Sequence, residues 1–171
     1  MNKKILKIAL LSVSMLVAVA PAINANIPAM KEAFPQIPLS MVEMITTIPS
    51  LFLMISVLTS GFIAKKIGYK QTIMLGLGIV AIAGIIPVFI GNFYLVLFSR
   101  AALGFGIGLF NSLLIGLISY FFDGNERTTL IGYHEALGGL GGMLITYIAG
   151  QLMHVNWQAP FISYAIAIPV F

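Results

Sequence analysis

The stretch FYLVLFSRAALGFGIGLFNSLLIGLISYFF, residues 93–122, carries one charged side chain, Arg100, in an otherwise largely apolar run. About 20 mainly apolar residues are enough for an α-helix to cross the hydrocarbon core of a bilayer. Because this stretch is longer than that, it predicts a helix that spans a membrane.

The composition of the whole chain also indicates lipid as its solvent. Of 171 residues, 60% are hydrophobic and 8% are charged, and the mean hydropathy is +1.05. A soluble domain carries about 25% charged residues, because water must solvate its surface. The net charge of +4 does not indicate nucleic-acid binding, because the basic residues lie in short clusters between apolar runs. The absence of cysteine excludes disulfides and thiolate metal sites, and we expect no other metal and no cofactor.

Four further stretches are long and apolar enough to cross a membrane, and only short connections separate them. The five predicted spans are residues 5–27, 41–64, 72–90, 93–122 and 130–153. A sixth begins near Gln158, and the residues up to Phe171 would reach about 21 Å as a helix, short of the ~30 Å core. We therefore expect an all-α membrane protein of five transmembrane helices and an incomplete sixth, forming one membrane domain over residues 1–171.

Basic residues predict the orientation of the chain, because cytoplasmic connections carry an excess of Lys and Arg. If every predicted span crosses, seven of the nine basic residues fall on one side, namely Lys3, Lys4, Lys7, Lys65, Lys66, Lys70 and Arg127. Lys31 falls on the other side. The N-terminus is therefore expected to be cytoplasmic.

The first 26 residues allow a second interpretation. A basic start, an apolar stretch and the sequence Ile23-Asn24-Ala25 are also typical of a cleaved secretory signal. The orientation of the second span is the same in both cases. Pro21 and the polar pair Asn24 and Asn26 fit either a bend beside a cavity or a helix end at the outer surface.

The connection after the second span reads GFIAKKIGYK, residues 61–70. It resembles the signature of the major facilitator superfamily between helices two and three, Gly-x-Leu-Ala-Asp-Arg-x-Gly-Arg-Lys. Six positions match in type: Gly61, Ile63, Ala64, Lys66, Gly68 and Lys70. Lys65 replaces an Asp that helps to latch the cytoplasmic gate in the family, and Tyr69 replaces an Arg. The resemblance implies a gate loop here, whereas a plain positive-inside loop would explain the lysines alone.

Residues 100–106 resemble the superfamily pattern of helix four, Arg-x-x-Gln-Gly-x-Gly, with Leu103 in place of Gln. An ionised Arg inside a membrane costs at least a few kcal/mol when it faces lipid. We therefore expect Arg100 to face a wet cavity or an acidic partner, although its long side chain could also reach the headgroups. The resemblance implies a place on the central pathway and a role in proton coupling.

Small residues on two predicted spans predict close helix packing. Gly104 and Gly108 are four residues apart on one helix, and Gly138 and Gly142 repeat this spacing on another. The glycine-rich helix five resembles an antiporter element of the superfamily only in part, so we interpret it as packing.

Protonatable side chains within spans are candidates for coupling, because a carboxylate tolerates lipid only when it is neutralised. His134 and Glu135 lie at the start of the fifth span, and Glu43 lies near the outer end of the second. Glu43 could equally be solvated at the interface, and His134 could be a polar packing group.

The last matching element is WQAPF, residues 157–161, which resembles the Trp-Arg-x-x-Phe entry to helix six in the same superfamily, with Gln158 in place of Arg. Trp157 also fits an ordinary interfacial anchor. The resemblance implies the first half of a twelve-helix transporter that moves a small solute by alternating access, with protons as the expected coupling ion and a second six-helix half as the expected partner. Uptake and efflux remain open, as does a non-transporting regulatory or assembly subunit. No phosphate loop, zinc-protease motif or nucleophile elbow indicates an enzyme.

Overall fold

The computed structural model describes residues 3–17 and 26–170, and every regular element among them is helical. In chain order the elements are α1 (Lys3–Ser14), α2 (Ile27–Ala33), α3 (Leu39–Ile67), α4 (Tyr69–Phe89), α5 (Phe93–Phe121), α6 (Gly124–Leu152) and the 3-10 helix η2 (Ala159–Val170). The prediction of an all-α fold is confirmed.

Within the described residues, α3, α4 and α5 are long and apolar enough to cross a membrane. They correspond to the second, third and fourth predicted spans. Helix α6 matches the fifth in position, and η2 begins one residue after the expected start of the sixth. That α6, η2 and the first segment also cross remains a prediction.

The first predicted span does not continue as one helix. Helix α1 ends at Ser14, and the next backbone bonds, Met15 N to Ser12 O and Leu16 N to Val13 O, join residues three apart. Such bonds tighten the chain into turns and end the α-helical ladder. Pro21 and Asn24 lie outside the described residues, as does most of the possible cleavage region.

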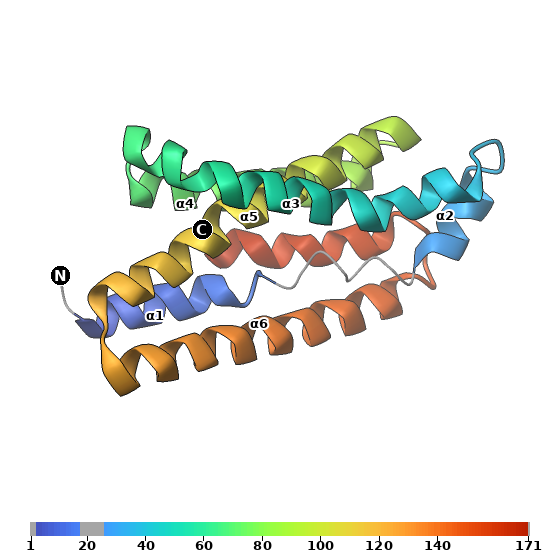
Figure 1. Cartoon of the computed structure of the whole chain (residues 1–171). Coiled ribbons are helices and arrows are strands. Elements are labelled where there is room, and N and C mark those ends of the chain that lie inside the picture. The colour runs from blue at the N-terminus through green and yellow to red at the C-terminus, as the bar shows by residue number, and fades with distance from the viewer. Residues whose placement is uncertain (1–2, 18–25, 171) are drawn as a thin grey trace.

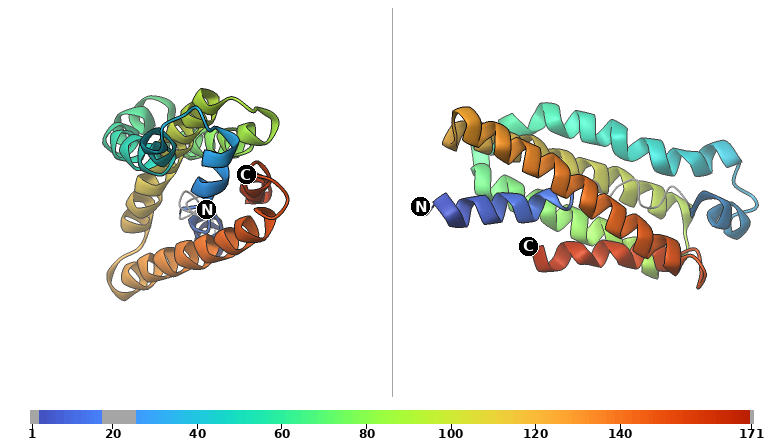
Figure 2. Two further views of the ribbon diagram at one scale, coloured as in Figure 1. Left: turned by 90° about the vertical axis from the view of Figure 1, so that its right-hand side faces the viewer. Right: turned by 90° about the horizontal axis from the view of Figure 1, so that it is seen from below.

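The helices form a bundle around α5, which packs against both α3 and α4 (Figure 1). The end-on view of Figure 2 shows α6 on the far side of the bundle from α3, with α1 between them. The 3-10 helix η2 contacts α4 and α6, and α1 contacts α6 and α5. Helix α5 is the most buried of the three candidate spans and α3 the least.

Three segments rich in basic residues lie at the same end of the bundle: the start of α1, the α3–α4 connection and the α5–α6 connection (Figure 1). Helix α2, which carries Lys31, lies at the opposite end. The arrangement agrees with the expected grouping of the basic residues. That this end is cytoplasmic remains a prediction.

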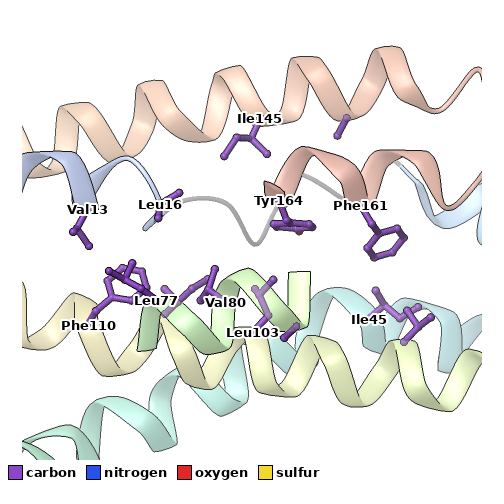
Figure 3. Close-up of a cluster of buried hydrophobic side chains, with 14 of the residues drawn as sticks. Val13, Leu16, Ile45, Leu77, Val80, Leu103, Phe110, Ile145, Phe161 and Tyr164 are labelled. Atoms are coloured by element: carbon purple, nitrogen blue, oxygen red, sulfur yellow. The ribbon is translucent and has the colours of Figure 1, made fainter. Parts of the chain in front are cut away.

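The apolar core lies where η2 faces α4 and α5. Figure 3 shows Phe161 and Tyr164 of η2 on one side, with Val80 of α4 and Leu103 of α5 on the other. All four side chains are at most 1% exposed. The chain before α2 is linked to the chain before η2, because Asn26 Nδ2 donates a hydrogen bond to the carbonyl oxygen of Trp157 at 2.7 Å.

The interface between α3 and α5 depends on glycine. A Cβ atom on Gly104 would collide with the backbone of Pro49, and one on Gly108 would lie 2.6 Å from the carbonyl oxygen of Leu53. Gly76 of α4 and Gly106 of α5 also pack closely, because a Cβ on either would lie 2.7 Å from the carbonyl oxygen of the other, and neither was predicted from the sequence as a packing position. Backbones packed this closely leave no space for any side chain between them.

Candidate functional site

Helices α1, α5 and α6 meet at His134, whose side chain is 1% exposed. Its Nδ1 lies 2.7 Å from Ser14 Oγ of α1, and its Nε2 lies 3.1 Å from Asn111 Oδ1 of α5. One helical turn further along α6, a Cβ on Gly138 would make an ordinary contact of 3.4 Å with the Ser14 carbonyl oxygen, whereas a Cβ on Gly141 would collide with the backbone of Met15. The ring therefore links three helices through its two nitrogens.

Glu135 accompanies the ring from the exposed side. Its Oε1 lies 4.0 Å from His134 Nε2, and its side chain is 70% exposed. That distance is too long for a hydrogen bond but short enough for a carboxylate to stabilise an imidazolium. The structure thus brings together the two residues that the sequence singled out as a pair.

Ser14 and Asn111 were not predicted from the sequence. Asn111 could have been noticed in the sequence, because an amide buried in a spanning segment without a hydrogen-bond partner destabilises the fold. Ser14 could not have been, since serine in a helix commonly bonds the carbonyl four residues back, and Ser14 Oγ does bond Leu10 O at 2.8 Å.

Arg100 lies elsewhere, in the core between α5, α4 and η2. Its guanidinium carbon lies 4.8 Å from the centroid of the Phe161 ring and 4.9 Å from that of Tyr164, and only 2% of the residue is exposed. Among the described residues no carboxylate pairs with it, and its Nη1 has no hydrogen-bond partner. Aromatic faces thus take the place of the expected acidic partner.

A proline makes a backbone acceptor available to Arg100, whose Nε also donates to Ser99 Oγ at 3.4 Å. Arg100 Nη2 donates to the carbonyl oxygen of Ala83 in α4 at 3.1 Å. Pro87 follows four residues later inside the same helix, and it has no N–H with which to bond that carbonyl. The proline therefore leaves Ala83 O free for the arginine, a signal that the sequence contained.

The other candidates lie apart from His134. Arg100 and Asn111 are both on α5, about 16 Å apart along the helix axis. Glu43 is exposed in the first turns of α3. The gate-loop candidates lie around the α3–α4 connection, where Lys65, Lys66 and Lys70 are exposed and Gly68 has a φ of 95° that favours glycine. Gly61 is exposed with open space around it, and Gly142 is buried in α6.

A second polar contact between α1 and α6 lies nearer the basic end of the bundle. Lys7 forms an ion pair with Glu126, and Lys7 Nζ also lies 5.4 Å from the centroid of the Phe122 ring. A cavity of about 400 Å³ adjoins the pair and is lined by Lys7, Leu11, Asn125, Glu126, Thr129, Leu130 and Tyr133.

Replacing Lys7 with glutamine is expected to lower the free energy of unfolding by at most about 1 kcal/mol, because both partners of the ion pair are part-exposed. Thermal unfolding in detergent measures the change, and a double-mutant cycle with Glu126→Gln isolates the pair. Lys66→Gln, at an exposed position, is the control. A loss well above this value would contradict the screening argument.

Among the described residues, no group of three or more His, Cys, Asp or Glu side chains is placed to hold a metal ion. A buried imidazole with two polar partners can take up or release one proton, and an exposed carboxylate beside it can balance the charge.

Comparison with known proteins agrees with the resemblance that the sequence motifs suggested. Residues 8–171 match the family model described as Major Facilitator Superfamily. A search of curated proteins gave no match. Since the family model covers nearly the whole chain, and since the fold is helical with apolar helices long enough to cross a bilayer, the chain belongs to the Major Facilitator Superfamily.

Proposed function

We propose that this membrane transporter moves a small solute across the cell membrane by alternating access coupled to protons. Its family comprises transporters rather than enzymes, and its apolar helices suit a lipid bilayer. In such folds two six-helix halves rock against each other around a central site. The mechanism therefore needs a second six-helix half beside the bundle described above.

The observation that carries proton coupling is the buried contact of His134 with Ser14 and Asn111. Histidine is the side chain whose ordinary pKa lies nearest neutral pH, so it changes charge within the range of physiological proton gradients. A titratable group held between helices at membrane depth is costly, and such groups commonly serve in proton relays. Because this ring of α6 bonds residues of both α1 and α5, a change of its charge acts on the packing of the three helices.

Glu135 and the basic end of the bundle have supporting roles in this proposal. Glu135 supplies the negative charge that balances a protonated His134 and offers a route for protons from the exposed side. The loop over residues 61–70 gates the cytoplasmic side, and Glu43 is a further coupling candidate at the opposite end of the bundle. Arg100 responds to the solute or the proton through the packing of α4 and η2.

Replacing His134 with glutamine is expected to lower solute-dependent proton flux by about tenfold or more, since glutamine keeps hydrogen-bonding groups but cannot carry the proton. The protein is reconstituted in liposomes that contain a pH-sensitive dye, and small solutes are added one class at a time under an imposed pH gradient. His154→Gln is the matched control, because His154 is exposed in the turn after α6. Equal coupled flux in the His134→Gln variant and wild type would remove this histidine from the mechanism.

A second candidate function is a non-transporting subunit that binds partner helices. One observation favours it: Gly132, Gly139 and Gly150 of α6 have open space where a Cβ would stand. Such small residues let another helix approach closely. Absence of any solute flux in the liposome assay, together with capture of a partner helix on this face, would favour the subunit over the transporter.

A further inference from the structure

We propose that Ser14 and Asn111 are positioning residues for His134. Ser14 holds a proton on Nδ1, and the side-chain amide of Asn111 changes its orientation according to whether Nε2 carries a second proton. The inference deepens the proposed function and rests on it, because it assigns the proton-dependent change of contact to the α5–α6 side of the ring. It follows from counting the hydrogen atoms that the described contacts need.

Ser14 determines that Nδ1 of His134 carries a hydrogen. A serine hydroxyl has one hydrogen to donate, and Ser14 Oγ lies 2.8 Å from the carbonyl oxygen of Leu10, which can only accept. The contact of 2.7 Å between Ser14 Oγ and His134 Nδ1 must then be made by a hydrogen on Nδ1. While Ser14 bonds Leu10, the ring carries Nδ1–H in both its neutral and its charged form.

The side-chain amide of Asn111 contacts the second ring nitrogen, Nε2, and its orientation depends on whether Nε2 is protonated. In the structure its Oδ1 faces His134 Nε2 at 3.1 Å, and a carbonyl oxygen can only accept. With Nδ1–H already present, Oδ1 in this position can accept only from Nε2–H of a doubly protonated ring. When the ring is neutral, Nε2 becomes an acceptor, and the amide must rotate to present its NH₂ group instead.

The α1 side of the ring is held more tightly than the α5 side. A Cβ on Gly138 would lie 3.4 Å from Ser14 O, and one on Gly141 would collide with the backbone of Met15, so main chain packs directly against α6. Asn111 instead reaches the ring through a side chain whose torsions can change. Proton uptake therefore alters the α5–α6 contact and leaves the α1–α6 contact in place.

The charged groups around the ring are consistent with uptake and release of a proton at Nε2. On α6, Glu135 Oε1 lies 4.0 Å from Nε2, the nitrogen that changes state. Beyond Glu135, the next charged residues along α1 and α6 are Lys7, Arg127 and Glu126, about two turns toward the basic end. Lys7 and Glu126 pair with each other, and Arg127 is exposed. On α5, the charged group of the helix is Arg100, about 16 Å from Asn111 along the axis. The second proton on Nε2 is thus balanced by Glu135.

The test is the protonation state of His134, read from ¹⁵N chemical shifts of the histidine-labelled 171-residue chain in lipid nanodiscs. A His154→Gln background leaves His134 as the one histidine in the chain. We expect the neutral ring to carry Nδ1–H. Ser14→Ala is expected to shift the tautomer equilibrium about fivefold toward Nε2–H, because one hydrogen bond to Nδ1 is lost.

Asn111→Asp places a carboxylate beside Nε2 and is expected to keep the ring doubly protonated to a pH about one unit higher or more. Asn111→Leu removes the acceptor and is expected to give the neutral ring at lower pH than in wild type. Ser112→Ala is the control on α5, because Ser112 bonds Ser60 and Gly108 and does not touch the ring. Its spectrum should equal that of wild type.

Two results would overturn the inference: a neutral wild-type ring that carries Nε2–H, or a Ser14→Ala variant with an unchanged tautomer equilibrium. The measurement does not depend on flux, so it fails separately from the proposed function. Nδ1–H that depends on Ser14, in a protein without proton-coupled flux, would leave the positioning roles standing and defeat the coupling proposal.

Discussion

Replacing Gly104 with alanine is expected to lower the free energy of unfolding by about 1–3 kcal/mol or more, although the change adds only one methyl group. The new Cβ would lie 2.6 Å from Pro49 Cα and 2.7 Å from its carbonyl carbon. These are main-chain atoms of α3, so no side chain can rotate away to make room. Relief requires α3 and α5 to separate along the interface that joins them.

Gly116→Ala in the same helix is the matched control, because nothing lies within 4 Å of the position where its Cβ would stand. This exposed site lacks the collision, so the substitution is expected to raise stability by up to about 1 kcal/mol through helix propensity. Thermal unfolding of both variants in the same detergent makes the comparison. If Gly104→Ala were as stable as Gly116→Ala, α3 and α5 would not pack as closely as the structure shows.

Replacing Arg100 with methionine is expected to abolish most coupled flux while leaving the fold as stable as wild type or more stable. The desolvation of a buried charge costs several kcal/mol, and its removal offsets the loss of about 1–3 kcal/mol that follows when the Ala83 carbonyl oxygen is left without its hydrogen bond. Arg100 is buried with one nitrogen unpartnered among the described residues, so its retention has a cost in stability. A cost of that kind suggests that the charge is kept for function.

Arg100→Ala is the companion variant, expected to lose about 2–5 kcal/mol because it leaves a cavity beside Phe161 and Tyr164. Arg127→Met, at an exposed position in α6, is the control for removal of a positive charge. Unfolding in detergent and flux in liposomes under a pH gradient separate stability from activity. Coupled flux in Arg100→Met equal to that of wild type would exclude Arg100 from the mechanism.

The partners of Arg100 could not be predicted from the sequence. Its charge in an apolar run predicted a side chain that faces a wet cavity or an acidic partner, and the structure places it in the core. The expected acidic partner is replaced by two aromatic rings and by a carbonyl that Pro87 leaves free. The proline and the arginine are far apart in the sequence, and no local pattern states that they meet.

The sequence alone determined the properties that depend on one segment at a time: the all-helical fold, the apolar spans over α3, α4 and α5, the grouping of basic residues at one end, and membership in the family. These follow from hydrophobic length, charge placement and motif spacing, all of which are local. The tertiary structure decided which polar groups meet. Ser14 and His134 are 120 residues apart, and their hydrogen bond depends on the rotation and axial offset of α1 against α6, which only the packing of the whole bundle fixes.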